Sequence, residues 1–394
     1  MAKLTLKDVD LKGKRVLVRC DFNVPQDADL KITDDTRIRA SLDTINYILG
    51  KDPAKLILIS HLGRPDGKAA AKYSLKPVAQ RLRELLNKEV RMLDDCVGEA
   101  VKSAIDSSQE EIILLENLRF HPEEETNEAN FAKALAGLAD IFVNDAFGTA
   151  HRAHASTEGV THYLTSVSGF LLEKEIRYLG GALDKPKKPF VVILGGAKVS
   201  DKIGVIDNLL PKADEIIIGG GMAYTFLKAQ GKQIGNSKLE KDKIDIAKGI
   251  LEKAKKMKVK IFLPQDNVVT DKIEAGSQVK TVGEDIPDGW IGVDIGPKTI
   301  REYCQTLKKA QTIVWNGPLG IFERDEFSSG TRQVAELIAG LKAVSIIGGG
   351  DTAAAVAKFG LESKMSHIST GGGASLEFLE GKMLPGIAAL TDKK

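Results

Sequence analysis

Short apolar runs rich in β-branched residues alternate along the chain with longer segments of helical periodicity. This alternation is typical of βα units, in which helices join parallel strands and cover both faces of a sheet. A helical pattern such as that of residues 73–87 separates two of the runs. We predict strands at residues 15–20, 55–60, 89–93, 111–116 and 140–145, and again at residues 190–196, 215–221, 260–264, 312–318, 344–350 and 367–373.

The pattern therefore predicts an α/β protein with two Rossmann-like lobes, each a mostly parallel sheet covered by helices and joined by a hinge helix. A chain of 394 residues is also too long for one hydrophobic core. We place the lobes at 1–170 and 190–379. The hinge helix and linker fall at 171–189, where we expect Gly180 and Gly181 to end the helix before Pro186 and Pro189.

Composition narrows the possible partners. The apolar fraction of 43% suffices for packed cores, and the net charge of only +2 gives no sustained basic field for a nucleic-acid backbone. We find no leader-like start and no uncharged apolar stretch long enough to cross a membrane, so we expect a cytoplasmic protein without nucleic-acid or membrane partners. The cysteines are scattered without metal-ligand spacing and are interpreted as reduced, packed thiols: Cys20, Cys96 and Cys304.

The two halves differ in the residues that follow their predicted strands, which is where ligands of open α/β sheets bind. Ten of the fourteen arginines precede residue 171, whereas only nine of the 38 glycines do. The first half is thus expected to offer charge and the second to offer exposed backbone.

Polar clusters follow the strands of the first half. A single arginine there would most simply be a surface ion pair, but several clusters at successive strand ends indicate a shared anion site. The planar guanidinium binds carboxylate and phosphate bidentately, so the ligand should carry both groups. His61 is interpreted as a ligand contact, while His121, His154, His162 and His367 are left unassigned. The clusters comprise Arg19, Asp21 and Asn23; His61 and Arg64; Asn117 and Arg119; Asn144, Asp145, His151 and Arg152; and Arg37.

Glycine-rich turns follow the strands of the second half. Such turns allow close approach to a phosphate and present free N–H groups at a helix start, which favours a nucleotide over a mere tight turn. Lys198 and Lys202 are four residues apart and are expected on one helical face toward the phosphates. Asp351 suggests that the nucleotide carries Mg²⁺. The turns are GGAK from Gly195, GGGM from Gly219, NGPLG from Asn316, GGGD from Gly348 and TGGGAS from Thr370.

Familiar nucleotide motifs are absent or incomplete. The chain lacks the Walker P-loop and the protein-kinase motifs. Gly348, Gly350 and Ala353 fit G-x-G-x-x-[GA], yet the acidic ribose contact of dehydrogenases is missing. An NAD-dependent dehydrogenase and a non-catalytic two-lobed binding protein remain as alternatives.

Over nearly all its length the chain resembles the phosphoglycerate kinase family, through RVLVRCDFNVP, SHLGRPDG, ENLRF, NDAFGTAHRAHAST, GGAKVSDK, WNGPLGIFE, GGGDTAAA and STGGGASLEFLEGK. The resemblance implies a monomer whose tail, 380–394, returns to the first lobe. It implies acceptor contacts at Asp21, Asn23, Arg37, His61, Leu62, Gly63, Arg64, Arg119 and Arg152. It implies nucleotide contacts at Gly195, Lys198, Lys202, Gly219, Gly292, Asn316, Glu323, Gly348, Gly349, Gly350, Asp351 and Thr352, with Asp351 on the metal.

The reaction implied by the resemblance is reversible phosphoryl transfer between 1,3-bisphosphoglycerate and ADP, which gives 3-phosphoglycerate and ATP. The acceptor carboxylate is already ionised at neutral pH, so no general base is needed. Catalysis then consists of alignment and charge neutralisation, with hinge closure to exclude water. The candidate catalytic groups are Arg37, Lys202, Mg²⁺ and the turn at Gly372 and Gly373.

Overall fold

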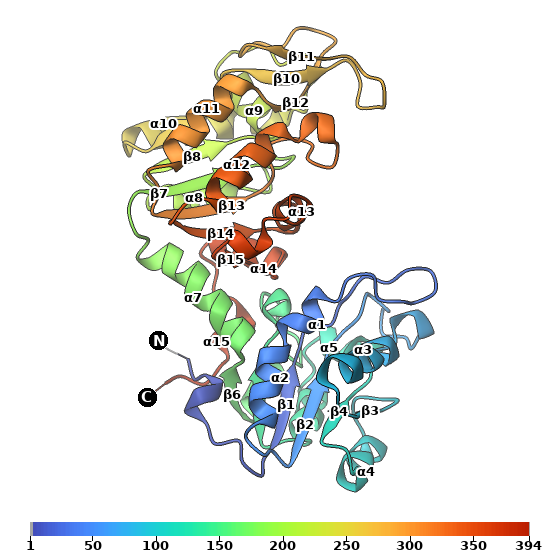
Figure 1. The fold of residues 1–394 in the computed structure, drawn as a ribbon. Coiled ribbons are helices and arrows are strands. Elements are labelled where there is room, and N and C mark those ends of the chain that lie inside the picture. The colour runs from blue at the N-terminus through green and yellow to red at the C-terminus, as the bar shows by residue number, and fades with distance from the viewer. Residues whose placement is uncertain (1–2, 394) are drawn as a thin grey trace. The chain divides into compact units, whose positions relative to one another are not determined.

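The protein was analysed as a computed structural model that describes residues 3–393. Two compact units are present: one runs up to Arg177 and resumes at Met383, and the other comprises Tyr178–Lys382. Within the described residues, each unit contains a six-stranded sheet in which all neighbouring strands are parallel (Figure 1). The predicted α/β class with two parallel sheets is confirmed.

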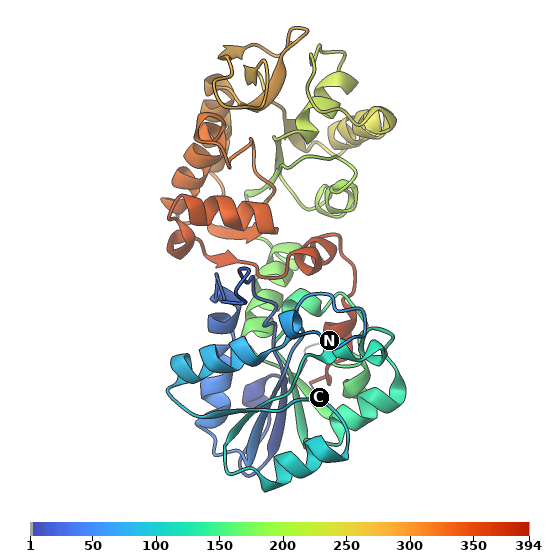
Figure 2. The same ribbon diagram turned by 90° about the vertical axis from the view of Figure 1, so that its right-hand side faces the viewer.

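The sheet of the first unit has the strand order β3-β4-β2-β1-β5-β6. Successive residues of a strand face opposite sides, so Val16 and Val18 enter one apolar core while Leu17 enters another. Helices cover both sides of these strands (Figure 2). The strands are β1 (Arg15–Arg19), β2 (Lys55–Ile59), β3 (Val90–Met92), β4 (Ile112–Leu114), β5 (Ile141–Asn144) and β6 (Thr165–Ser168); the helices are α1 (Thr36–Ala40), α2 (Leu42–Leu49), α3 (Lys76–Leu86), α4 (Glu99–Ser107), α5 (Pro122–Glu125) and α6 (Ala129–Ala136).

The sequence prediction for this unit missed one strand and placed one helix start wrongly. Strand β6 was not predicted, because Val167 is its one large apolar residue. The helix expected from Tyr73 begins instead at Lys76, where Pro77 occupies the first turn. Tyr73 ends a short 3₁₀ helix, one of the set η1 (Leu6–Asp8), η2 (Ala71–Tyr73), η3 (Leu118–Phe120), η4 (Phe147–Thr149), η5 (Gly159–His162), η6 (Lys241–Lys243), η7 (Asp325–Phe327) and η8 (Glu362–Lys364).

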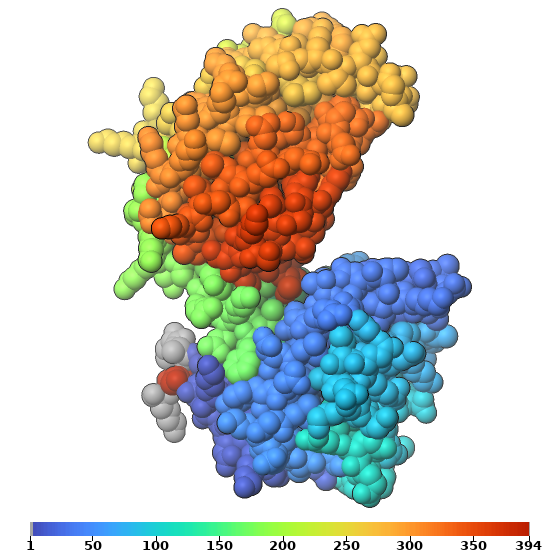
Figure 3. Space-filling model, in the orientation of Figure 1, coloured from blue at the N-terminus to red at the C-terminus, as the bar shows by residue number. Residues whose placement is uncertain are grey.

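The main sheet of the second unit has the strand order β15-β14-β13-β7-β8-β9. Its central strands are fully buried on both faces, as parallel strands under helices are expected to be. The orange helices α11 and α12 lie in front of this sheet, and in the space-filling view their side chains cover it (Figure 3). The strands are β7 (Phe190–Leu194), β8 (Glu215–Ile218), β9 (Lys260–Phe262), β13 (Thr312–Asn316), β14 (Val344–Gly348) and β15 (His367–Ile368); the helices are α8 (Ile203–Leu209), α9 (Met222–Ala229), α10 (Ile244–Lys256), α11 (Pro297–Leu307), α12 (Ser329–Ala339), α13 (Gly350–Lys358) and α14 (Gly373–Leu379).

A small antiparallel sheet in the second unit escaped the sequence prediction. It has the order β11-β10-β12. Strand β11 is largely exposed, so it has no apolar run to detect. The strands are β10 (Asn267–Thr270), β11 (Val279–Val282) and β12 (Ile291–Ile295).

Helix α7 (Phe170–Asp184) connects the two units and continues through Gly180 and Gly181. The expectation that these glycines end the helix was therefore wrong. Each glycine costs about 0.5–1 kcal/mol in a helix, but the buried Leu179 and Ala182 on either side of them provide compensating packing. The carboxylate of Asp145, at the end of β5, accepts a hydrogen bond from Leu171 N at 2.9 Å and so caps the helix start.

After the second unit, the chain returns to the first through α15 (Pro385–Ala388). Gly386 N donates to Ala150 O at 2.9 Å, and Asn144 Nδ2 donates to Gly386 O at 3.1 Å. Leu4 N donates to Thr391 O at 2.9 Å, so the beginning and end of the described chain are joined. No helix within residues 3–393 is long and apolar enough to cross a membrane.

The packing of β8 gives a test of the fold. Replacing the fully buried Ile217 by Ala should lower the free energy of unfolding of the second unit by about 2–5 kcal/mol, through lost burial and a residual cavity. The matched change Val279→Ala, at a position 44% exposed in β11, should cost less than about 0.5 kcal/mol. Urea unfolding monitored by circular dichroism measures the free energy of unfolding of both variants. Equal losses of stability in the two variants would contradict the burial of Ile217 and the exposure of Val279.

Candidate functional site

Arg19, at the end of β1, is a fully buried charge beneath the polar edge of the first sheet. Its Nε donates to Ser156 Oγ at 2.9 Å, and its Nη2 lies 3.2 Å from His61 Nδ1. The buried carboxylate of Glu124 accepts hydrogen bonds from Ser156 Oγ and from Ser156 N, at 2.5 and 2.9 Å. A ligand cannot reach Arg19, which therefore supports the site from behind.

Two histidines share this positive environment. Burial, followed by the charges of Arg19 and Arg119, lowers the pKa of His61 well below its usual range. Burial, followed by the charges of Arg119 and Arg19, lowers the pKa of His154 to about 3. Both imidazoles are therefore neutral at neutral pH and can donate or accept hydrogen bonds without adding charge.

Asp21 and Asn23 position groups of neighbouring loops. The carboxylate of Asp21 pairs with the guanidinium of Arg37 on α1, and the two side chains are 9% and 37% exposed. Asn23 Oδ1 accepts a hydrogen bond from Gly63 N at 2.8 Å. Gly63 has φ +64°, and a Cβ there would lie 2.4 Å from the Tyr73 ring. The Asp21 carboxylate thus holds a partly exposed arginine at the sheet edge.

The remaining predicted acceptor residues differ in exposure. Leu62 packs into the core and is 3% exposed, so only its backbone is available. Arg119 is 6% exposed, and its Nη1 donates to Gly63 O at 2.8 Å. Burial is the first cause that lowers the Arg119 pKa, and the nearby Arg152 lowers it further. Arg152 is half-buried and Arg64 is exposed. Arg119 and Arg152 are therefore neighbouring positive charges with limited access to water.

Glycines bring the loops after β7, β8 and β13 into backbone contact. A Cβ on Gly195 would lie 2.1 Å from Pro318 O, and a Cβ on Gly317 would lie 2.2 Å from Gly195 O. Gly317 also has φ +101°. A Cβ on Gly219 would meet the side chain of Leu319 at 2.5 Å. Side chains at these positions would force the loops apart.

Beside these loops lies a cavity of about 350 Å³, entirely within the second unit. Of the predicted nucleotide residues, Gly292, Glu323 and Asp351 line it. A Cβ on Gly292 would come within 2.3 Å of the Tyr224 hydroxyl. Its lining residues are Gly196, Ala197, Gly220, Gly221, Tyr224, Lys238, Ile273, Ile291, Gly292, Val293, Pro318, Gly320, Ile321, Glu323 and Asp351.

The lysine pair does not lie on a helix face as expected, because α8 begins only at Ile203. The preceding turn is held by Glu240, whose carboxylate accepts hydrogen bonds from the N–H groups of residues 199 and 200. Lys202 is half-buried, and burial lowers the pKa of its ammonium group, while the nearby carboxylates of Asp201 and Asp351 oppose that change. Lys198 is exposed.

Asn316, at the end of β13, carries a buried donor: its Nδ2 has no hydrogen-bond partner among the described residues. Ideal Cβ atoms on Gly348 and Gly349 would lie 3.1 and 3.4 Å from that nitrogen. Thr352, fully buried, accepts a hydrogen bond from Gly317 N at 2.6 Å. An unpaired buried N–H is costly, so this position suits an acceptor oxygen of a ligand.

Two helices, α13 and α14, begin at the glycine-rich turns that follow strands β14 and β15 of the second unit. Helix α13 begins at Gly350 with Asp351, which is exposed, in its first turn. Helix α14 begins at Gly373 after Gly372, whose φ is +50°. The loop before it is fixed because Ser375 Oγ donates to Gly372 O at 3.1 Å.

Sequence reasoning missed the apolar part of the cavity. Tyr224, Ile273, Ile291 and Val293 carry no chemical signature, and β12 was not predicted. The exposure of Ile273, 46%, is unusual for a large apolar side chain. Burial raises the pKa of Tyr224, so its hydroxyl keeps its proton. These residues could hold the flat, apolar part of a ligand.

The fold and the candidate sites define a two-domain α/β protein with an arginine-rich polar edge on one sheet and a glycine-lined cavity beside the other. The chain belongs to the phosphoglycerate kinase family, whose profile matches residues 6–382. Phosphoglycerate kinases from Pseudothermotoga lettingae and Pelotomaculum thermopropionicum are 58% and 56% identical to it, over the whole of both chains.

Two solved phosphoglycerate kinase structures are similar in fold to this chain. Phosphoglycerate kinase from Coxiella burnetii has a TM-score of 0.91 and 44% identity, and covers 98% of each chain. The enzyme from Pyrococcus horikoshii has a TM-score of 0.84 and 34% identity, with the same coverage.

The neutral state of His154 gives a pH prediction. Its pKa of about 3 in the folded protein lies below the usual value, so between these values only the unfolded chain takes up the proton. Stability must then fall as the pH drops below about 6.5. His154→Asn should reduce the loss between pH 7.5 and 5 by on the order of 1 kcal/mol.

Urea unfolding at several pH values measures this loss. His162→Asn is the control, because that side chain is 64% exposed and its ion pair with Glu158 contributes little. If His154→Asn and the control both keep the wild-type pH dependence, the neutral assignment of His154 is wrong.

Proposed function

We propose that this chain is a phosphoglycerate kinase, which transfers a phosphoryl group reversibly between 1,3-bisphosphoglycerate and ADP to give 3-phosphoglycerate and ATP. The observation that carries the proposal is the full-length match to phosphoglycerate kinases at 56–58% identity. These relatives do not favour the alternatives, a dehydrogenase or a non-catalytic binding protein. A monomeric state, which the resemblance implies, is part of the proposal.

The acceptor is proposed to bind at the polar edge of the first sheet. Its phosphate would meet the arginines Arg64, Arg119 and Arg152, of which two are shielded from water and so act more strongly. The neutral His61 and the loop carrying Asn23 would orient the carboxylate end. Because that carboxylate is ionised near neutral pH, it attacks without help from a base.

The nucleotide is proposed to bind in the cavity of the second unit. Gly292 has no side chain and packs against Tyr224 in the cavity wall, which leaves room for the flat base. The Nδ2 of Asn316, which has no partner, would donate a hydrogen bond to a phosphate oxygen. Lys202 would balance the phosphate charge. Its reduced pKa reflects burial, and the anionic ligand would favour its charged form.

Asp351 is the proposed ligand of Mg²⁺. Its exposed carboxylate borders the cavity and lies near the Lys202 ammonium, and hard oxygen donors of this kind suit that cation. When bound, Mg²⁺ would neutralise charge on the nucleotide phosphates. The turn at Gly372 and Gly373 is proposed to face the transferring group. In-line transfer requires both substrates to meet without water, so we propose closure about the connecting segment during turnover.

A coupled assay tests the proposal. ATP consumption should depend strictly on 3-phosphoglycerate and should be abolished by a chelator and restored by Mg²⁺. ATP hydrolysis that is indifferent to 3-phosphoglycerate, or no consumption by folded protein, would contradict it.

The contact between Gly292 and Tyr224 yields a prediction for binding. Gly292→Ala places a methyl group where only 2.3 Å is available, so it should displace the tyrosine and raise the Kd for ADP at least about tenfold. Gly283→Ala, where a Cβ meets nothing within 4 Å, is the matched control. Calorimetric titration should show unchanged affinity for 3-phosphoglycerate in both variants. Normal ADP affinity in Gly292→Ala would exclude the base-binding role of this cavity wall.

Arg37 yields a kinetic prediction. It is partly exposed and held by Asp21, while three other arginines are available for the acceptor phosphate. We expect it to stabilise the phosphoryl group during transfer, so Arg37→Ala should lower kcat by on the order of 10²-fold with little change in KM.

Arg39→Ala serves as the control and should retain normal kinetics, because Arg39 lies in the same helix and pairs with Asp35, away from the Asp21 carboxylate. Steady-state measurements of kcat and KM distinguish a catalytic role of Arg37 from a binding role. A raised KM for 3-phosphoglycerate with near-normal kcat in Arg37→Ala would make Arg37 a binding residue only.

A further inference from the structure

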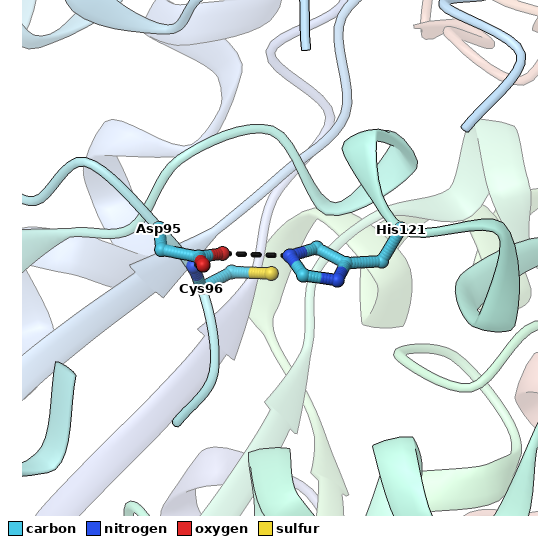
Figure 4. A group of neighbouring side chains, drawn as sticks. All are labelled: Asp95, Cys96 and His121. Atoms are coloured by element: carbon cyan, nitrogen blue, oxygen red, sulfur yellow. Dashed lines mark hydrogen bonds and ion pairs between the residues drawn. The ribbon is translucent and has the colours of Figure 1, made fainter. Parts of the chain in front are cut away.

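Three donor groups of different chemistry meet in the first unit, outside the sites described above. Asp95 and Cys96 lie in the loop after β3, and His121 directly follows η3. A carboxylate oxygen, the thiol sulfur and an imidazole nitrogen all lie within 4.8 Å of one another. Figure 4 shows the carboxylate and the thiol directed toward the same side of the His121 ring.

Existing contacts already hold these groups in place. His121 Nε2 and Asp95 Oδ1 are 2.6 Å apart, and Asp95 Oδ1 also accepts a hydrogen bond from Cys96 N at 2.7 Å. The His121 ring packs against Phe131, with ring centroids 5.3 Å apart. Two segments distant in sequence thus present fixed donors to one point.

The three side chains differ in their exposure to solvent. Cys96 is fully buried, whereas the side chains of His121 and Asp95 are 28% and 52% exposed. A buried thiol is out of reach of a substrate, so a nucleophilic Cys–His–Asp triad does not fit. An ion could enter from the solvent side, through the carboxylate and the imidazole, and retain one water ligand there.

We propose that Asp95, Cys96 and His121 form a binding site for a thiophilic divalent cation of the Zn²⁺ type, with water as the fourth ligand. Sulfur, imidazole and carboxylate donors together suit Zn²⁺, while Mg²⁺ prefers oxygen ligands alone. This site is therefore distinct in chemistry from the magnesium proposed at the nucleotide.

The geometry requires only small shifts. Bond lengths near 2.0–2.3 Å in a tetrahedron place donor atoms about 3.3–3.6 Å apart. The Asp95–His121 pair at 2.6 Å must open by less than about 1 Å, and the widest pair, at most 4.8 Å, must close by no more than about 1.2–1.5 Å. Rotations of the exposed Asp95 carboxylate and of the partly exposed His121 imidazole can supply such changes.

A bound ion would join the loop after β3 to the turn η3. That turn contains Arg119, two residues before His121, so the cross-link would stabilise the backbone next to the anion site. The site needs no substrate, which separates this proposal from the proposed function.

Cobalt spectroscopy tests the site. Metal-free full-length protein should bind one Co²⁺ per chain in the presence of excess Mg²⁺, with the strong visible bands of a tetrahedral ion and a near-ultraviolet thiolate-to-cobalt band. Zn²⁺ should displace the Co²⁺. A six-coordinate spectrum without a thiolate band, or displacement by Mg²⁺, would overturn the proposal.

Substitutions of single residues test which side chains bind the ion. Cys96→Ser and His121→Asn should each weaken Zn²⁺ binding by about 100-fold or more, measured by competition against a chromophoric chelator. Cys304→Ser, at a half-buried cysteine of the other unit, should bind as the wild type does. Because His121 is partly exposed, His121→Asn should remain folded even if Cys96→Ser does not. Unchanged affinity in His121→Asn, or equal loss in Cys304→Ser, would refute the site.

Discussion

The parallel pairing of strands is the constraint on which both candidate sites depend. Because neighbouring strands run in the same direction, the loops that follow them all leave from one edge of their sheet. Residues separated by more than 100 positions, such as Arg19 and Ser156, then come within hydrogen-bond distance. The same rule brings Gly195 and Gly317 into backbone contact.

The two edges use this convergence in opposite ways. In the first unit, charge is concentrated and must be neutralised: Arg19 is buried with Glu124 and Ser156, and burial keeps His61 uncharged. Removing one member of such a network would leave an uncompensated buried charge. The charges at this sheet edge are therefore held in place by hydrogen bonds.

In the second unit, side chains are removed so that backbones can approach. Glycines let the loops meet at distances that no Cβ would tolerate, and other glycines of these loops line the cavity beside them. Few polar atoms are specifically placed there: Asn316, at the end of β13, keeps a donor without a partner, and Asp351, in the first turn of α13, has an exposed carboxylate. A flexible, charged ligand with a flat portion matches this division between apolar wall and polar rim.

The sequence by itself determined the α/β class, the alternation of strands and helices, and the polar and glycine-rich character of the strand ends. These follow from local periodicity and from residue chemistry, which need no knowledge of distant contacts. The motifs also indicated the family, because they preserve the residues of the strand ends in order. The position of α13 and of Asp351 in its first turn was likewise predictable, since Gly349 and Gly350 mark the turn.

Only the tertiary structure decided the rest. Leu62 and Arg19 look like site residues in their motifs, yet packing buries their side chains. Helix α7 continues through two glycines because Leu179 and Ala182, on either side of them, are buried. The lysine pair does not lie on a helix, because Glu240, about 40 residues later in the sequence, holds the turn that contains it. The apolar cavity wall, the exposed strand β11 and the meeting of Cys96 with His121 arise from contacts between distant segments, and no local pattern records such contacts.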